Sequence, residues 1–170
     1  GPVRVYGSNG VVGSHSEALV PDPAVIVGRK GSVGEVHLSE GPSWPIDTAF
    51  YVQGSDKADL HFLFYLLQTL PITSNSDSAV PGLSREYAHS IEFKAPGLKT
   101  QRAIGRTLRV FDRKISLNES LSKTLGEIAR SIFKSWFVDF DPVKAKMAGE
   151  APLGIDTETA ALFPDSMEKT

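Results

Sequence analysis

A glycine-rich turn carries the side chains best suited to binding an anion. Glycines occupy positions 28, 31 and 34, and Arg29, Lys30 and Ser32 lie between them. A Walker phosphate loop would require a Lys-Ser/Thr pair leading into a helix, whereas residues typical of a strand follow this turn. We therefore expect Arg29, Lys30 and nearby backbone N–H groups to approach an anion such as a nucleic-acid phosphate. Ordinary turn formation is the alternative for the same residues.

The sequence contains no convincing catalytic or metal-binding pattern. The four histidines are scattered, with no carboxylate or second histidine at helical ligand spacing. No serine lies in a G-x-S-x-G elbow. Asp112 and Lys114 have the spacing of a nuclease D-x-K element, but they fall within a predicted helix, where a charged surface is the simpler interpretation. The absence of cysteine excludes disulfide scaffolds and thiolate zinc sites. We expect no metal, no cofactor and no catalysis in this chain.

Polar side chains in the turns form a candidate DNA-reading set. Arginine can form two hydrogen bonds with guanine, and asparagine or glutamine can do so with adenine. Turn formation explains Ser8 and Asn9 sufficiently, because Asn-Gly dipeptides favour tight turns, whereas it explains Asn75 and Arg85 less well. The candidate DNA-binding residues are Tyr6, Ser8, Asn9, Arg29, Lys30, Ser32, Thr73, Ser74, Asn75, Ser84 and Arg85.

The first half of the chain predicts short strands and one helix. Segments 3–6, 25–27, 36–38, 46–52 and 91–94 are rich in β-forming residues, and the second and third of them predict a hairpin around the glycine-rich turn. Asp56 is the predicted N-cap of a helix that ends at Leu70, before Pro71, and residues 71–82 form a loop. This order predicts an α+β fold, a β-rich domain with short helices followed by one long coiled-coil-type helix.

The long helix is predicted by a heptad seam in the second half of the chain. Apolar residues alternate at spacings of four and three, with Asn118 and Ser122 as polar interruptions. A helix over about 100–138 would be roughly 58 Å long, so its apolar face requires a partner helix; a long helix with a solvated bend is the alternative. The predicted pairing residues are Ile104, Leu108, Phe111, Ile115, Leu121, Leu125, Ile128, Ile132, Trp136 and Phe137.

Charge divides the chain into three segments. Residues 1–99 contain seven Lys/Arg and ten Asp/Glu, residues 100–147 contain ten and five, and residues 148–170 contain one and five. Arg102, Arg106, Arg109 and Arg113 form a stripe about 200° around the helix from the seam, suited to phosphates, an acidic partner or solvent. We expect a domain over 1–97, the helix over 98–147 and a linker or tail over 148–170. No apolar run approaches 18 residues and no export signal is evident, so we expect a cytoplasmic protein without a membrane span.

Several sequence strings resemble the specificity subunit of type I restriction-modification systems. They are VYGSNGVVG, IVGRKGSVGEV, WPIDTAFYV, VPGLSREY and FKSWFVDFDPVKAKM. The resemblance implies a non-catalytic subunit in which two target-recognition domains alternate with two long antiparallel helices, and each domain reads one half of a split DNA site. It also implies methyltransferase partner subunits with S-adenosylmethionine and, indirectly, a motor-endonuclease subunit with ATP and Mg²⁺.

By this resemblance the chain is one target-recognition half with its helix. The domain is expected to lack its first strands, and the tail GIDTETAALFPDSMEKT resembles a connection to a second domain. The implied direct partners are double-stranded DNA, the methyltransferase subunits, and a second half-unit or a second copy paired through the helix. In the family, a Pro-Pro pair and a Glu usually precede the position of Gln101. This chain has Ala95, Pro96 and Gly97 in place of the pair and Thr100 in place of the Glu. A fragment of a fused restriction-methylation enzyme and a half-length scaffold or dimerisation protein are the alternatives.

Overall fold

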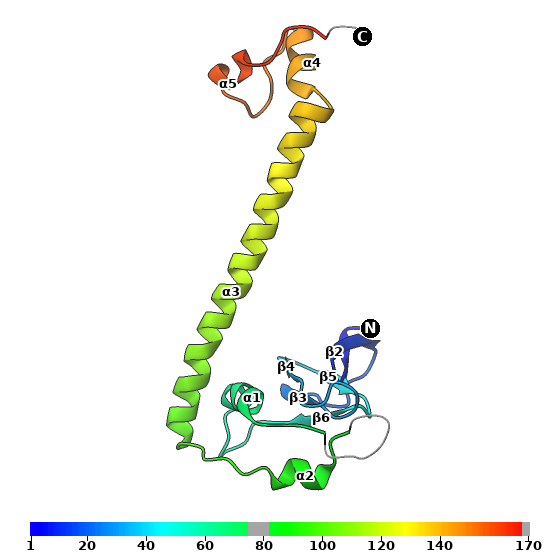
Figure 1. Ribbon diagram of the computed structural model, residues 1–170, viewed down its shortest axis with the longest axis vertical. Coiled ribbons are helices and arrows are strands. Elements are labelled where there is room, and N and C mark those ends of the chain that lie inside the picture. Colours follow the sequence, from blue (N-terminus) through cyan, green and yellow to red (C-terminus); the bar gives the residue numbers. More distant parts are fainter. Residues whose placement is uncertain (75–81, 168–170) are drawn as a thin grey trace. The chain divides into compact units, whose positions relative to one another are not determined.

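The computed structural model describes residues 1–74 and 82–167. They belong to two compact units, Gly1–Asp112 and Arg113–Thr170, and Figure 1 labels their elements. The strands are β1 (Val3–Gly7), β2 (Gly10–His15), β3 (Ala24–Gly28), β4 (Val36–Ser39), β5 (Ser43–Pro45) and β6 (Ala49–Val52). The helices are α1 (Leu60–Thr69), α2 (Arg85–Ser90), α3 (Leu98–Phe133), the π-helix η1 (Lys134–Val138), α4 (Asp141–Met147) and α5 (Thr157–Ala161).

The first unit contains two three-stranded sheets, ordered β2-β1-β5 and β4-β3-β6. The predicted hairpin is confirmed, because β3 pairs antiparallel with β4 through Val25 with Leu38 and Val27 with Val36. The predicted strand over 46–52 begins only at Ala49, whose N–H donates to the carbonyl of Ile46 in a turn. With the short helices and the long α3, these sheets confirm the predicted α+β fold.

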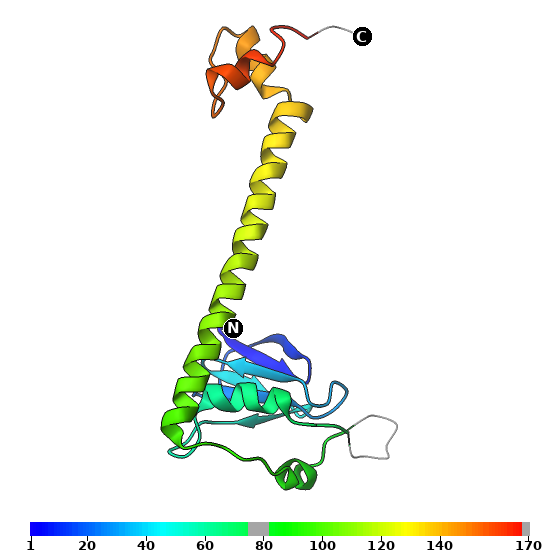
Figure 2. The same ribbon diagram turned by 60° about the vertical axis from the view of Figure 1, so that its left-hand side comes forward.

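Strand β3 forms the centre of the core. All five of its residues are buried, as expected for a strand that is covered on both faces. On one face Ile26 packs with Tyr6 and Val20, and on the other Val25 packs with Leu63 of α1. Figures 1 and 2 show α1 beside the sheets and the start of α3.

Two predicted elements of the first unit are wrong in position or type. The N-cap of α1 is Asp59, whose Oδ1 accepts a hydrogen bond from the Phe62 N–H at 3.0 Å, because residues 55–58 form a turn in which Ser55 N–H donates to the Ala58 carbonyl. The predicted strand over 91–94 has no regular structure. Instead, the helix α2 precedes it, and the Ser84 side chain caps that helix by accepting from the Tyr87 N–H.

The first turns of α3 are fixed to the N-terminus of α1 by a buried glutamine. The Gln101 side chain is 4% exposed. Its Oε1 accepts from the Asp59 N–H at 3.0 Å, and its Nε2 donates to the carbonyls of Lys57 and Pro96 at 3.2 and 2.8 Å. One turn later, a Cβ on Gly105 would lie 2.9 Å from the Phe62 backbone nitrogen, so only glycine permits this close approach between the helices.

Two polar contacts extend this attachment along α3. Arg109 forms a 2.5 Å ion pair with Glu40, and the Tyr65 hydroxyl donates to Asp112 at 2.6 Å. Burial, together with the hydrogen bond and negative charge of Asp112, raises the pKa of Tyr65 to about 12. Arg109 therefore contacts its own domain and is not a free member of the predicted arginine stripe.

The helical stretch from Leu98 to Val138 agrees with the helix predicted over about 100–138, but it does not continue to residue 147. The α-helix becomes the π-helix η1 at Lys134, and Phe140 has a left-handed backbone (φ 56°) immediately before α4. Pro142 lies in the first turn of α4, where proline is tolerated because no intrahelical N–H bond is required there. The chain thus breaks the helix at Phe140 and starts a new one.

The described part of the predicted linker or tail folds back onto α4 and η1. Lys146 of α4 donates to the Phe163 carbonyl at 2.6 Å and forms a 2.6 Å ion pair with Asp165. The Phe163 ring packs edge-on against Trp136 with 5.5 Å between centroids. Trp136, a predicted pairing residue, is therefore half-buried within its own unit.

Candidate nucleic-acid interface

Five segments of the first unit converge into one surface, which we term the loop cluster. They comprise residues 7–10, 28–34, 46–49, 72–74 and 82–85. The backbone N–H groups of Arg29 and Lys30 both donate to the Thr48 carbonyl, at 2.9 and 3.2 Å, and the Leu83 N–H donates to the Arg29 carbonyl at 2.8 Å. These hydrogen bonds bring together candidate residues that are far apart in the sequence.

Two glycines permit the close approach of these turns. A Cβ on Gly28 would lie 2.0 Å from the Ser32 carbonyl oxygen and 2.7 Å from that of Ser8. Gly34 has φ +83°, and a Cβ there would lie 2.3 Å from the Ile72 carbonyl oxygen. The glycine-rich turn is therefore shaped by packing against neighbouring turns, a cause that its sequence did not reveal.

The cations of the loop cluster have different surroundings. Lys30 forms an exposed ion pair with Asp47 at 3.2 Å, and such a pair contributes only about 0–1 kcal/mol to stability, so Lys30 can exchange this partner for a phosphate at little cost. The Arg29 guanidinium lies 5.0 Å from the Phe50 ring centroid in a cation–π contact. Arg85 is exposed at the start of α2.

The hydroxyl groups of two candidate residues have structural roles. Ser74 Oγ donates to the Gly82 carbonyl at 3.1 Å and accepts from the Gly82 N–H at 2.9 Å, and Ser84 caps α2. Ser8 and Ser32 are half-buried, and Asn9 and Thr73 are exposed. The exposed polar side chains Asn9, Thr73 and Arg85 are thus better placed than the serines to contact a ligand.

One candidate residue is wrong and another lies outside the described residues. Tyr6 is only 3% exposed and packs with Val20 and Ile26. The packing of β1 directs its ring into the core, where DNA cannot reach it. Asn75 lies within residues 75–81, which the structure does not describe.

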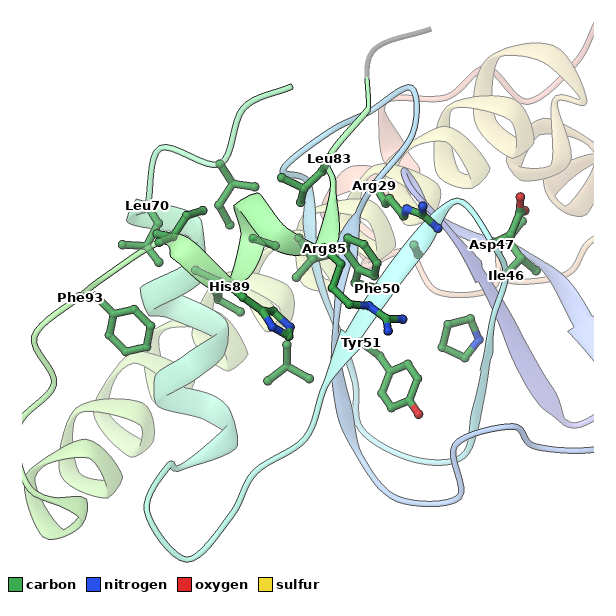
Figure 3. A pocket seen from close by; sticks show the side chains of 18 of the residues that line it. Arg29, Ile46, Asp47, Phe50, Tyr51, Leu70, Leu83, Arg85, His89 and Phe93 are labelled. Atoms are coloured by element: carbon green, nitrogen blue, oxygen red, sulfur yellow. The ribbon is translucent and has the colours of Figure 1, made fainter. Parts of the chain in front are cut away.

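A hollow of about 630 Å³ adjoins the loop cluster (Figure 3). Apolar residues line most of it, including residues of β6 and of the segment after α2, and Arg29, Arg85 and His89 add nitrogen-bearing side chains. Figure 3 shows Arg85 and His89 reaching from α2 toward β6, which carries Phe50 and Tyr51. Sequence reasoning missed His89, although its position four residues after Arg85 places both on the same helix face.

The apolar seam of α3 is a second candidate surface. Its side chains from Phe111 onward are largely exposed, with exposed fractions of 61% at Phe111 and 54% at Ile115, whereas Leu108 is half-buried. Leu121, Leu125, Ile128 and Ile132 continue the exposed series, and Ile104 and Phe137 are also exposed. An exposed apolar row of this length is suited to packing against another helix.

Within the described ranges, no group of three or more His, Asp or Glu residues could hold a metal ion. In the same residues, no helix has both the length and the apolar character needed to cross a membrane.

Comparison with known proteins identifies the family. Residues 2–127 match the sequence model of the family described as the type I restriction modification DNA specificity domain. The chain belongs to this family. The match includes the described loop cluster and most of α3, and it confirms the resemblance predicted from the sequence strings.

Two curated proteins that resemble the chain are named specificity subunits. The chain is 39% identical over 75 residues to the type I restriction enzyme HindI specificity subunit of Haemophilus influenzae, a match that covers 44% of the chain and 16% of that protein. It is 24% identical over 131 residues to the MjaIX specificity subunit of Methanocaldococcus jannaschii, covering 74% and 30%.

The fold of the specificity domain also matches a solved structure. The S subunit of a type I restriction-modification system from M. genitalium aligns with a TM-score of 0.57 and 20% identity, over 87% of this chain and 39% of that one. The specificity domain thus spans well under half the length of these relatives.

Proposed function

We propose that this chain recognises a DNA sequence as part of the specificity subunit of a type I restriction-modification system. The observation that carries the proposal is the convergence of Arg29, Lys30 and Arg85 in the loop cluster of a chain from the DNA specificity domain family. The chain performs no catalysis in this proposal. It selects the DNA site at which partner subunits act.

The cations have separate roles in this proposal. Lys30 and Arg29 lie on the glycine-rich turn and neutralise phosphates, which positions the domain but carries no sequence information. Arg85 is exposed at the edge of the cluster and can reach a base edge in the major groove, where an arginine can form two hydrogen bonds with guanine. The exposure of Arg85 and the positions of Arg29 and Lys30 on the glycine-rich turn support this division of roles.

The exposed seam of α3 supports an assembly role. We propose that it packs against the helix of a second half-unit or a second copy and that methyltransferase subunits, which carry S-adenosylmethionine, bind this helical region. A motor-endonuclease subunit that uses ATP and Mg²⁺ would join the complex indirectly. In the first alternative, a half-length scaffold, the chain would pair through the same seam, but the loop cluster would not need to select DNA sequences. In the second alternative, a fused enzyme, the catalytic residues would lie outside this chain.

Binding titrations of the full chain, at one fixed salt concentration and in a salt series, test the division of roles. Arg29→Ala with Lys30→Ala should weaken binding to all duplexes similarly and lower the salt slope by about one or two units. Arg85→Ala should cost roughly 1–3 kcal/mol on the preferred duplex and little on scrambled DNA. The control is Arg4→Ala, which removes an exposed arginine outside the cluster. Equal losses on both duplexes for Arg85→Ala would show that this residue does not read bases.

A further inference from the structure

Among the residues that the structure describes, no strand pairs with the outer edge of β6. The sheet order is β4-β3-β6, and β6 pairs with β3 alone, from Ala49 opposite Gly28 to Val52 opposite Val25. The backbone of an edge strand presents N–H and C=O groups that another extended chain can bind. The Ala49 N–H already donates to the Ile46 carbonyl, and the remaining unpaired groups of this edge form a geometric template for one additional strand.

The hollow follows this edge on both sides of the strand. Phe50 and Val52 belong to the apolar cluster that contains α1, whereas Ala49 packs against the cluster on the opposite face, and all of them line the hollow. Ile91, Phe93, Pro45 and Ile46 add further apolar side chains to its lining. Because side chains of a strand alternate between two faces, a strand added here would place alternate side chains against this apolar surface.

Charge indicates the composition of such a strand. Arg29, Arg85 and His89 line the hollow, and Asp47, the one acidic residue among its lining side chains, is paired with Lys30. Carboxylates on a bound segment would complement the two arginines. The hollow is thus suited to a segment that combines apolar and acidic side chains.

We propose that the edge of β6 binds an extended, acidic and apolar segment of a partner polypeptide as an added strand. Backbone hydrogen bonds to β6 supply affinity, and the apolar walls with Arg85 supply selectivity. This surface shares Arg29 and Arg85 with the proposed DNA-binding surface, but its ligand is a peptide and its contacts centre on a strand edge.

Titration of the full chain with the acetylated peptide Thr-Val-Glu-Val-Thr-Val-Glu, without DNA, tests the proposal. We expect saturable binding and at least a ten-fold slowing of backbone amide exchange within Ala49–Val52, measured by NMR. The same peptide with lysine at each glutamate should bind at least ten-fold more weakly. A version with proline at each threonine and glutamate loses backbone donors and should also bind at least ten-fold more weakly.

A matched pair of variants locates the site. Ala88→Trp places a large ring in the hollow and should weaken binding at least ten-fold, whereas Ala103→Trp, on the exposed surface of α3, should leave binding unchanged. If Ala88→Trp does not fold, the peptide controls decide the question with the natural sequence. No saturation at about 1 mM peptide, equal binding of the lysine peptide, or unchanged exchange within Ala49–Val52 would overturn the proposal. If the natural chain shows no preference among DNA sequences in a separate titration, that result contradicts the proposed function and leaves the peptide-binding proposal standing.

Discussion

Gln101→Met should lower the free energy of unfolding by about 2–4 kcal/mol, because it removes all three hydrogen bonds of the buried amide. The Asp59 N–H and the carbonyls of Lys57 and Pro96 would lose their partner at the junction of α1 and α3. Methionine has a similar volume, so the loss reports hydrogen bonding more than packing. Urea denaturation of the full chain, followed by circular dichroism, measures the change.

Gln68→Met is the matched control for this prediction. Gln68 is an exposed glutamine of α1 whose Nε2 donates only to the Phe64 carbonyl in its own helix, and its replacement should change stability by less than about 0.5 kcal/mol. Similar effects of the two substitutions would contradict the attachment of α3 to α1 through Gln101.

Ile115→Asp should leave the fold of the single chain intact but abolish helix pairing. Ile115 is 54% exposed, so the carboxylate remains hydrated in the unpaired chain. In a packed seam the same carboxylate would be buried without a partner, at a cost of about 3–5 kcal/mol. Sedimentation of the chain with its helical partner or with a second copy measures the loss, and circular dichroism verifies that α3 is retained.

Ser120→Asp adds the same charge on the opposite face of α3. Ser120 is exposed and lies two residues from the seam positions 118 and 122, which is a rotation of about 200° around the helix. This control should pair as the natural chain does. Equal pairing of both variants would refute the seam as the assembly surface.

The sequence predicted the elements whose pattern is local and strong. The β3–β4 hairpin is evident because β-formers flank a glycine-rich turn, and α3 is evident because its heptad pattern continues over many turns. Strand β2 was missed because Val11 and Val12 are 55% and 53% exposed and show no inward-facing alternation. The six-residue α2 depends on the Ser84 cap, a signal too short to compete with the β-forming residues that follow it.

The candidate site was predicted in composition but not in arrangement. The turn-forming residues around Arg29, Lys30 and Arg85 indicated that these cations lie in loops. The structure brings their segments together through hydrogen bonds to the carbonyls of Thr48 and Arg29. The burial of Tyr6 depends on long-range packing that one sequence does not show. The role of Gln101 likewise depends on Asp59, which is 42 residues away.

Selection of bound duplexes from a random DNA library by the full chain tests DNA sequence recognition most directly. The natural chain should enrich one short motif, and Arg85→Ala should lose preference at one position of that motif while retaining the others. An unselected spectrum of sequences for the natural chain would contradict sequence recognition by the loop cluster.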